Sequence, residues 1–261
     1  MAASLQALVF DVDGTLADTE RDGHRVAFNA AFADFGLRWR WSVARYGDLL
    51  AVPGGRERLL HFFDQERIPL SAGERNGLAR DLHARKTRHY LERVGQGAIG
   101  WRQGVLRVIA EARAAGLRLA IATTTTRANV DALLARAPRN LGQAFEVIGA
   151  AGDCARLKPD PGIYHHVLAR LGLAAADCLA IEDSASGLAA ARGAGIATVV
   201  TRNPYTRNQR FDGALAVLDG LGEPTQPARW LGGSPHRLCV DIDQLRRWHA
   251  TASNLRHATV T

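Results

Sequence analysis

The stretch LQALVFDVDGTLADTE, residues 5–20, decides the fold, because a short apolar run ends directly at two aspartates. A run of this kind is typical of a strand that is buried on both faces of a parallel sheet. Asp11 and Asp13 are two residues apart, so in extended backbone their side chains project to one side. Gly14 permits the turn that follows. The stretch therefore predicts a buried strand that carries two carboxylates at its tip.

Four further apolar runs repeat this pattern and alternate with helical patterns. The apolar runs cover 117–122, 145–150, 178–182 and 196–201, and the helical patterns cover 103–116, 127–137, 162–172 and 186–195. Strands that alternate with helices over short connections predict an α/β fold with a doubly wound parallel sheet. Ligands of such a sheet bind at the carboxyl ends of its strands. The residues that follow each apolar run are therefore the candidates for a functional site.

The alternation is interrupted between residues 19 and 93, where the periodicity is helical throughout. We expect this segment, 19–93, to form an inserted α-helical cap domain, with linkers at 17–22 and 93–101. Residues 1–18 and 94–223 then form the catalytic core. Residues 224–261 are a C-terminal extension that packs on the core or trails from it. Within it, RLCVDIDQLRRWHA (237–250) predicts a strand and a helix.

The charge of the chain favours an anionic partner. The net charge is +7 and the pI is near 10.0, yet the arginines are scattered and form no basic block. Nucleic acid is therefore not the partner we expect, and a phosphorylated small-molecule substrate suits the same charge. Lys86 and Lys158 are the two lysines among the 33 basic residues, which suggests positions that require a compact ammonium group.

The sequence favours a monomeric cytoplasmic protein, or its equivalent in a plastid stroma. No apolar run approaches the 18 residues of a membrane span, and the first ten residues lack the pattern of a signal peptide. The three cysteines have unrelated spacings, which indicates a reducing compartment and no cysteine metal motif. A membrane partner is not expected.

Polar residues follow three more of the predicted strands. The threonines at 123–126 either cap the next helix or bind a phosphate at its N-terminus. Glu182 and Asp183 suit a helix start, and Lys158 lies beside a helix cap that does not explain it. Each feature alone has a structural explanation. Together with Asp11 and Asp13 they predict a Mg²⁺ and phosphate site, because hard divalent cations prefer oxygen ligands.

These motifs resemble those of the haloacid dehalogenase (HAD) superfamily of phosphatases and phosphomutases. DVDGT, the threonine after LAIA, the lysine of LKPDPGIY and IEDSASGL agree with its four motifs in order and spacing. The resemblance implies the following roles: Asp11 as nucleophile, Asp13 as general acid/base, Thr123 as phosphoryl contact, Lys158 as charge stabiliser, and Asp11, Asp13 (through its carbonyl), Glu182 and Asp183 as Mg²⁺ ligands.

The cap resembles, in its position and its helical pattern, the caps of β-phosphoglucomutase and phosphoglycolate phosphatase relatives. It resembles the cap of the CbbY group most closely. GGRERLL (54–60) and ARKTRHY (84–90) resemble cap segments that contact the far end of the substrate. The implied substrate contacts are Glu20, His24, Tyr46, Gly55, Arg56, Lys86 and Thr124. One extra residue precedes His24 compared with the usual TExxH spacing, which leaves the role of His24 open.

The resemblance implies a Mg²⁺-dependent phosphatase that hydrolyses a sugar (bis)phosphate, with xylulose 1,5-bisphosphate as the substrate of the CbbY group. A bisphosphate needs cations at both ends of its pocket, and Lys158 and Lys86 suit the two ends. A β-phosphoglucomutase-like mutase and a phosphoglycolate phosphatase are the alternatives on the same scaffold. The motifs do not separate them, because water or a sugar hydroxyl can attack the same aspartyl-phosphate.

Overall fold

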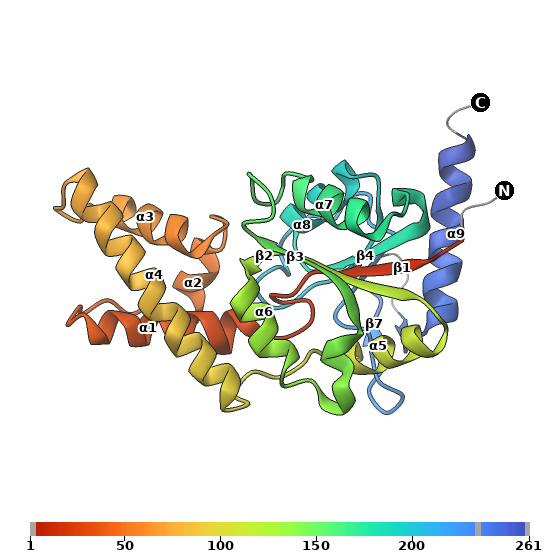
Figure 1. Cartoon of the computed structure of the whole chain (residues 1–261), viewed down its shortest axis with the longest axis horizontal. Helices are drawn as coiled ribbons and strands as arrows, with labels where there is room; N and C mark the ends of the chain where they lie inside the picture. The colour runs from red at the N-terminus through yellow and green to blue at the C-terminus, as the bar shows by residue number, and fades with distance from the viewer. Residues whose placement is uncertain (1–3, 233–235, 259–261) are drawn as a thin grey trace.

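The computed structural model describes residues 4–232 and 236–258, and its centre is a six-stranded parallel sheet (Figure 1). The strands are β1 (Ala7–Phe10), β2 (Arg118–Thr126), β3 (Phe145–Ala151), β4 (Cys178–Glu182), β5 (Ala197–Thr201) and β6 (Ala216–Leu218), in the order β3-β2-β1-β4-β5-β6. The predicted doubly wound α/β fold is confirmed. The strand order switches between β1 and β4, which is where such sheets bind their ligands.

Helices cover both faces of the sheet. They are α5 (Val105–Ala114) and α6 (Arg127–Leu134) on one face, and α7 (Gly162–Leu171) and α8 (Ala185–Gly193) on the other, with short 3₁₀ turns η2 (Pro138–Ala144) and η3 (Ala175–Asp177). Leu8 and Phe10 of β1 face the first pair of helices, whereas Ala7 and Val9 face the second. The continuous apolar run of β1 follows from this burial on both faces.

A second hydrophobic cluster lies among the helices between β1 and β2. These helices are the π turn η1 (Glu20–His24), α1 (Arg25–Asp34), α2 (Val43–Leu49), α3 (Gly55–Gln65) and α4 (Ala72–Gly95), and they lie at the carboxyl end of β1 (Figure 1). Phe28, Phe32, Trp41 and Phe63 are fully buried in their cluster, which is separate from those of the sheet. We call this group of helices the cap. The domain boundaries at 18/19 and 93/94 stay a prediction.

The two connections between cap and core lie side by side. The backbone N–H of Asp18 donates to the carbonyl of Gly100 (3.1 Å), and that of Arg102 donates to Leu16 (2.9 Å). Short isolated bridges also pair Ala17 with Trp101. The chain therefore enters and leaves the cap through one narrow, hydrogen-bonded strip.

The C-terminal extension packs on the core. It contains β7 (Ala228–Arg229), β8 (Arg237–Leu238) and α9 (Ile242–Ala258), so the strand and helix predicted within 237–250 are present. Val240 and Leu245 are fully buried in the same cluster as α5. Strands β6 and β7 were not predicted, because runs this short carry no periodicity. None of the helices in the described residues combines the length and the apolar character that a membrane span requires.

Gly104→Ala is expected to loosen the contact between the start of α5 and the backbone at Leu221 and Gly222, just before the C-terminal extension. Gly104 has φ +82°, and an added Cβ would lie 2.7 Å from the Leu221 carbonyl carbon. The left-handed conformation alone costs a residue with a side chain about 1–3 kcal/mol. The free energy of unfolding in urea should therefore fall by at least about 1 kcal/mol.

Gly77→Ala is the matched control, because Gly77 lies within α4 with no atom within 4 Å of an added Cβ. Its stability should rise by about 0.5–1 kcal/mol, since alanine is the better helix former. Equal stability of the Gly104→Ala variant and the wild type would contradict the tight contact.

Candidate active site

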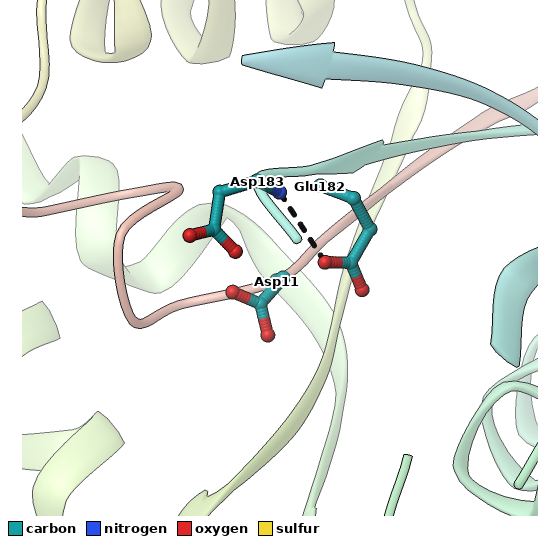
Figure 2. Close-up of side chains that lie close together, drawn as sticks. All are labelled: Asp11, Glu182 and Asp183. Atoms are coloured by element: carbon teal, nitrogen blue, oxygen red, sulfur yellow. Dashed lines mark hydrogen bonds between the residues drawn. The ribbon is translucent and has the colours of Figure 1, made fainter. Parts of the chain in front are cut away.

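Three carboxylates meet at the tips of β1 and β4. Asp11, Glu182 and Asp183 are each buried, and one ligand oxygen from each lies within 4.8 Å of the others. Figure 2 shows their carboxyl groups turned toward one another. Phe10 pairs with Ile181 in the parallel ladder, and the Asp11 amide donates to the Ile181 carbonyl (3.0 Å). The register of the two strands therefore brings the predicted motifs together.

Lys158 forms ion pairs with two of these carboxylates. Its Nζ lies 2.8 Å from Asp11 Oδ1 and 2.6 Å from Glu182 Oε1, and it also donates to the Ala122 carbonyl (2.8 Å). The Tyr164 hydroxyl donates to the same Glu182 oxygen (2.5 Å). Burial would lower the pKa of Lys158, but the two carboxylates raise it above its ordinary value. The ammonium is therefore charged.

One ammonium does not balance three carboxylates. Burial raises the pKa of Asp11 to about 7, although the nearby charge of Lys158 opposes the rise. Burial, with the charges of Asp11 and Glu182, also raises the pKa of Asp183 well above its ordinary value. A second cation would relieve this repulsion. Buried carboxylate oxygens are the donors that Mg²⁺ prefers, so the residues present fit that ion.

Asn203 and Gly14 hold Asp183 in place. Asn203 Nδ2 donates to Asp183 Oδ2 (2.6 Å). Gly14 has φ +84°, and an added Cβ would lie 2.6 Å from both of these atoms. Asn203 was not predicted, although it follows the predicted strand at 196–201. The strand-tip rule applied to that strand would have found it.

Asp13 is paired with His24 of the cap. The His24 Nε2 lies 3.1 Å from Asp13 Oδ1, and the imidazole stacks on Tyr90 at 4.1 Å between ring centroids. Burial alone would raise the pKa of Asp13, but the charge and hydrogen bond of His24 lower it to about 2. In this arrangement Asp13 is ionised.

The extra residue before His24 is accommodated by a π turn. Glu20–His24 is π-helical, and the amide of Arg25 donates to the Glu20 carbonyl five residues back. A π turn takes up one residue more than an α turn without breaking the helix. This geometry brings His24 onto Asp13 despite the longer spacing.

Two adjoining cavities extend from the carboxylates into the cap. The first has a volume of about 320 Å³ and contains Asp11, Lys158 and Asp183 in its wall. The second, of about 270 Å³, contains Arg56 and Lys86. Both are lined by Asp13, Glu20, Gly54, Arg58 and Thr124.

Most of the predicted site residues line these cavities. They are Asp11, Asp13, Glu20, His24, Gly55, Arg56, Lys86, Thr124, Lys158 and Asp183. Three others are buried behind the walls. Thr123 Oγ1 accepts from the Thr125 amide (3.2 Å), the Tyr46 hydroxyl donates to Glu20 (2.5 Å), and Glu182 binds Lys158.

The cap contributes two buried cations to the walls of these cavities. Lys86 is 4% exposed and has no hydrogen-bond acceptor among the described residues; its Nζ lies 5.0 Å from the Phe28 ring centroid. Burial lowers the pKa of Lys86 to about 8. Arg58 is also buried and donates to the Tyr46 hydroxyl (3.0 Å) and the Leu49 carbonyl (3.2 Å). The sequence did not predict Arg58.

Arg56 lies nearer the rim than its neighbour Arg58. Its side chain is 43% exposed and donates to Asn76 Oδ1 (2.8 Å). Positions two apart on a helix point about 200° away from each other. Because α3 turns position 58 inward, Arg56 is the more exposed of the two. The phase of α3 was not read from the sequence.

A model of the haloacid dehalogenase-like hydrolases matches residues 5–195, which include all of the carboxylates described above. The chain belongs to this family. It is an enzyme, a phosphoric monoester hydrolase of the HAD type.

CbbY proteins are among its relatives. The plasmid CbbY of Cupriavidus necator is 52% identical over 248 residues, which cover 94% of this chain and 97% of the relative. A CbbY variant from Rhodobacter sphaeroides, solved in complex with xylulose-(1,5)bisphosphate, is 40% identical with a TM-score of 0.74, covering 85% of this chain and 98% of that one. A β-phosphoglucomutase from Clostridium difficile (18% identical, TM-score 0.68, covering 98% and 100%) shares the fold.

His24→Ala is expected to raise the pKa of Asp13 from about 2 toward its ordinary value, because the variant loses the His24 charge and hydrogen bond that oppose burial. A pH titration of the ¹³C-labelled aspartate carboxyl resonances measures this shift. His89→Ala is the matched control, since His89 bonds Asp34 on the outer side of the cap. This variant should change only the pKa of Asp34. An unchanged pKa of Asp13 in the His24→Ala variant would disprove the coupling.

Proposed function

We propose that the protein is a Mg²⁺-dependent phosphatase that hydrolyses a sugar bisphosphate, xylulose 1,5-bisphosphate, through an aspartyl-phosphate on Asp11. The observation that most strongly supports this proposal is the distribution of buried cations. Lys158 lies at the Asp11 end of the adjoining cavities, whereas Arg58 and Lys86 lie in the cap. A substrate with a phosphate at each end suits cations contributed by both the core and the cap. The CbbY complex with xylulose-(1,5)bisphosphate supports the same choice.

In the first half-reaction, a carboxylate oxygen of Asp11 bonds to phosphorus while the bond from phosphorus to the sugar oxygen breaks. The leaving oxygen takes a proton from the Asp13 carboxyl group. In the second half-reaction, water attacks phosphorus, Asp13 accepts its proton, and the bond from phosphorus to Asp11 breaks. Lys158 stabilises the negative charge in both halves through its contact with Asp11.

A Mg²⁺ ion held by Asp11, Asp183, Glu182 and the Asp13 carbonyl would neutralise charge and orient the phosphoryl group. Asn203 keeps Asp183 turned toward that site through its hydrogen bond. Gly14 leaves the space that both side chains need.

Asp13 must be protonated for the first half-reaction and ionised for the second. Its contact with His24 favours the ionised form, because it lowers the pKa to about 2. Loss of this contact leaves burial to raise the pKa. We therefore propose that movement of the cap, which carries His24, changes the protonation of Asp13 between the two halves.

At the far end, we propose that Lys86 and Arg58 bind the second phosphate, with Arg56 at the rim. Lys86 has cation–π contacts with Phe28 and Tyr90 but no acceptor among the described residues, so an anion would supply its missing partner. Glu20, held by Tyr46, is positioned to accept hydrogen bonds from sugar hydroxyls.

Assays with xylulose 1,5-bisphosphate, phosphoglycolate and β-glucose 1-phosphate test the proposed substrate. Phosphate should be released from the bisphosphate with the highest kcat/KM, and only with Mg²⁺ present. Asp13→Asn should lower kcat by roughly 10²–10⁴, which is the usual contribution of general acid/base catalysis. Isomerisation of the glucose phosphate with little phosphate release would instead identify a mutase. Preference for phosphoglycolate would identify the other alternative.

Lys86→Gln should raise KM for the bisphosphate about 10- to 100-fold, because a hydrogen bond to a charged group contributes about 1.5–3 kcal/mol. KM for p-nitrophenyl phosphate, which has no distal phosphate, should change little. In the wild type, KM for the bisphosphate should rise as pH increases through about 8, where Lys86 loses its proton.

Arg56→Ala is the control, because it removes a cation from the exposed rim of the same cavity. Its effect on the bisphosphate should be the smaller one. Equal effects of Lys86→Gln on both substrates would place Lys86 outside the binding site.

A further inference from the structure

A third cavity lies outside the active site, beside the two connections to the cap. Its volume is about 400 Å³, against about 320 and 270 Å³ for the two catalytic cavities. Asp18 and Arg102 contribute from the connections, and the loops after β5 and β6 contribute most of the rest. Of the residues given a role in the active site above, Asn203, which supports Asp183, also lines this cavity.

Arginines dominate the wall of this cavity. They are Arg102, Arg202, Arg207 and Arg229, and the acidic side chains in the wall are Asp18 and Asp219. The wall therefore holds two more positive than negative charges. Its volume lies within the range of small-molecule sites, which is about 300–1,000 Å³.

Two of the four arginines are already engaged. Arg229 Nε pairs with Asp219 Oδ2 (2.7 Å). The buried Arg102 donates through Nη2 to the carbonyls of Arg202 (3.1 Å) and Asp219 (3.1 Å), and its Nη1 lies 3.4 Å from Asp18. These contacts fix the floor of the cavity.

The other two arginines, Arg202 and Arg207, have no acidic partner within the described part of the chain. Arg202 Nη1 donates to the carbonyl of Arg207 (3.0 Å), and this contact brings the two residues together. The guanidinium of Arg207 itself has no hydrogen bond or ion pair among the described residues. The exposed guanidinium of Arg207 and the remaining N–H donors of Arg202 are therefore available at one side of the cavity.

We propose that this cavity binds a phosphate-bearing anion as a regulatory ligand. The planar fork of arginine binds phosphate oxygens in pairs, and the free Arg207 guanidinium beside the remaining donors of Arg202 suits the double charge of a phosphate monoester. The volume exceeds what a bare phosphate needs, so a phosphorylated metabolite of sugar size is the class of ligand that it fits.

The loop between Arg202 and Arg207 connects this cavity to the active site. Its Asn203 lines both cavities and donates to Asp183 (2.6 Å). Arg102 and Asp18 belong to the strip through which the cap is connected. An anion held by this loop therefore lies beside Asn203, which supports Asp183, and beside the connections to the cap. Binding at this cavity and binding at the active site are therefore coupled.

Calorimetric titration with inorganic phosphate in the presence of Mg²⁺ tests the site. The wild type should bind one phosphate at this cavity in addition to those bound in the active site. Arg207→Ala should lose that additional binding event, and because its side chain has no partner among the described residues, folding is not at stake. Arg202→Ala should weaken the same event.

Arg210→Ala is the matched control, because Arg210 is 87% exposed on the adjacent segment, pairs with Asp212 and removes the same charge. It should retain every binding event of the wild type. The proposal is overturned if Arg207→Ala binds as many phosphates as the wild type with the same affinity. It is also overturned if Arg210→Ala weakens binding as much as Arg207→Ala.

Kinetics test the coupling, and this part rests on the proposed phosphatase function. Phosphate should inhibit the wild type with a noncompetitive component that is absent in Arg207→Ala. Purely competitive inhibition of the wild type would overturn the regulatory role. The titration does not depend on turnover, so it separates failure of the site from failure of the proposed function.

Discussion

The contact of one ammonium group with two buried carboxylates supports the rest of the active site. Lys158 lies between Asp11 and Glu182, and all three are at least nine-tenths buried. Removing the ammonium would leave three carboxylates together without a protein cation, which is strongly unfavourable. The surrounding residues serve this cluster. At Gly187, for example, in the first turn of α8, a side chain would collide with the Glu182 carboxylate, so only glycine fits there.

The cap is connected to this cluster through Asp13. The cap residue His24 bonds the carboxylate that lies two positions after Asp11, and the π turn at Glu20–His24 makes this contact possible. The same cap brings Lys86 and Arg58 to the far side of the cavities. Position and protonation in the active site therefore both depend on where the cap lies. This explains why the connections between cap and core are hydrogen-bonded over so short a strip.

The sequence predicted the sheet and the central carboxylates because both depend on local pattern. Apolar runs that end in acids reveal buried strands, and the parallel topology brings their tips together. It could not predict features that depend on the phase of a helix or on tertiary contact. Arg58 rather than Arg56 points inward because of how α3 packs. The role of His24 depended on a π turn, and no sequence pattern indicates where an inserted residue is absorbed.

Binding of Mg²⁺ tests the account most directly, because the repulsion among Asp11, Glu182 and Asp183 is its central claim. Calorimetric titrations at pH 7 in two buffers of different ionisation enthalpy measure both the ion and the protons exchanged. The account predicts one Mg²⁺ per chain with release of protons, since burial raises the pKa of Asp11 to about 7 and that of Asp183 above its ordinary value. Binding should be lost in Asp183→Asn. Undiminished binding by that variant, or binding without proton release, would contradict the account.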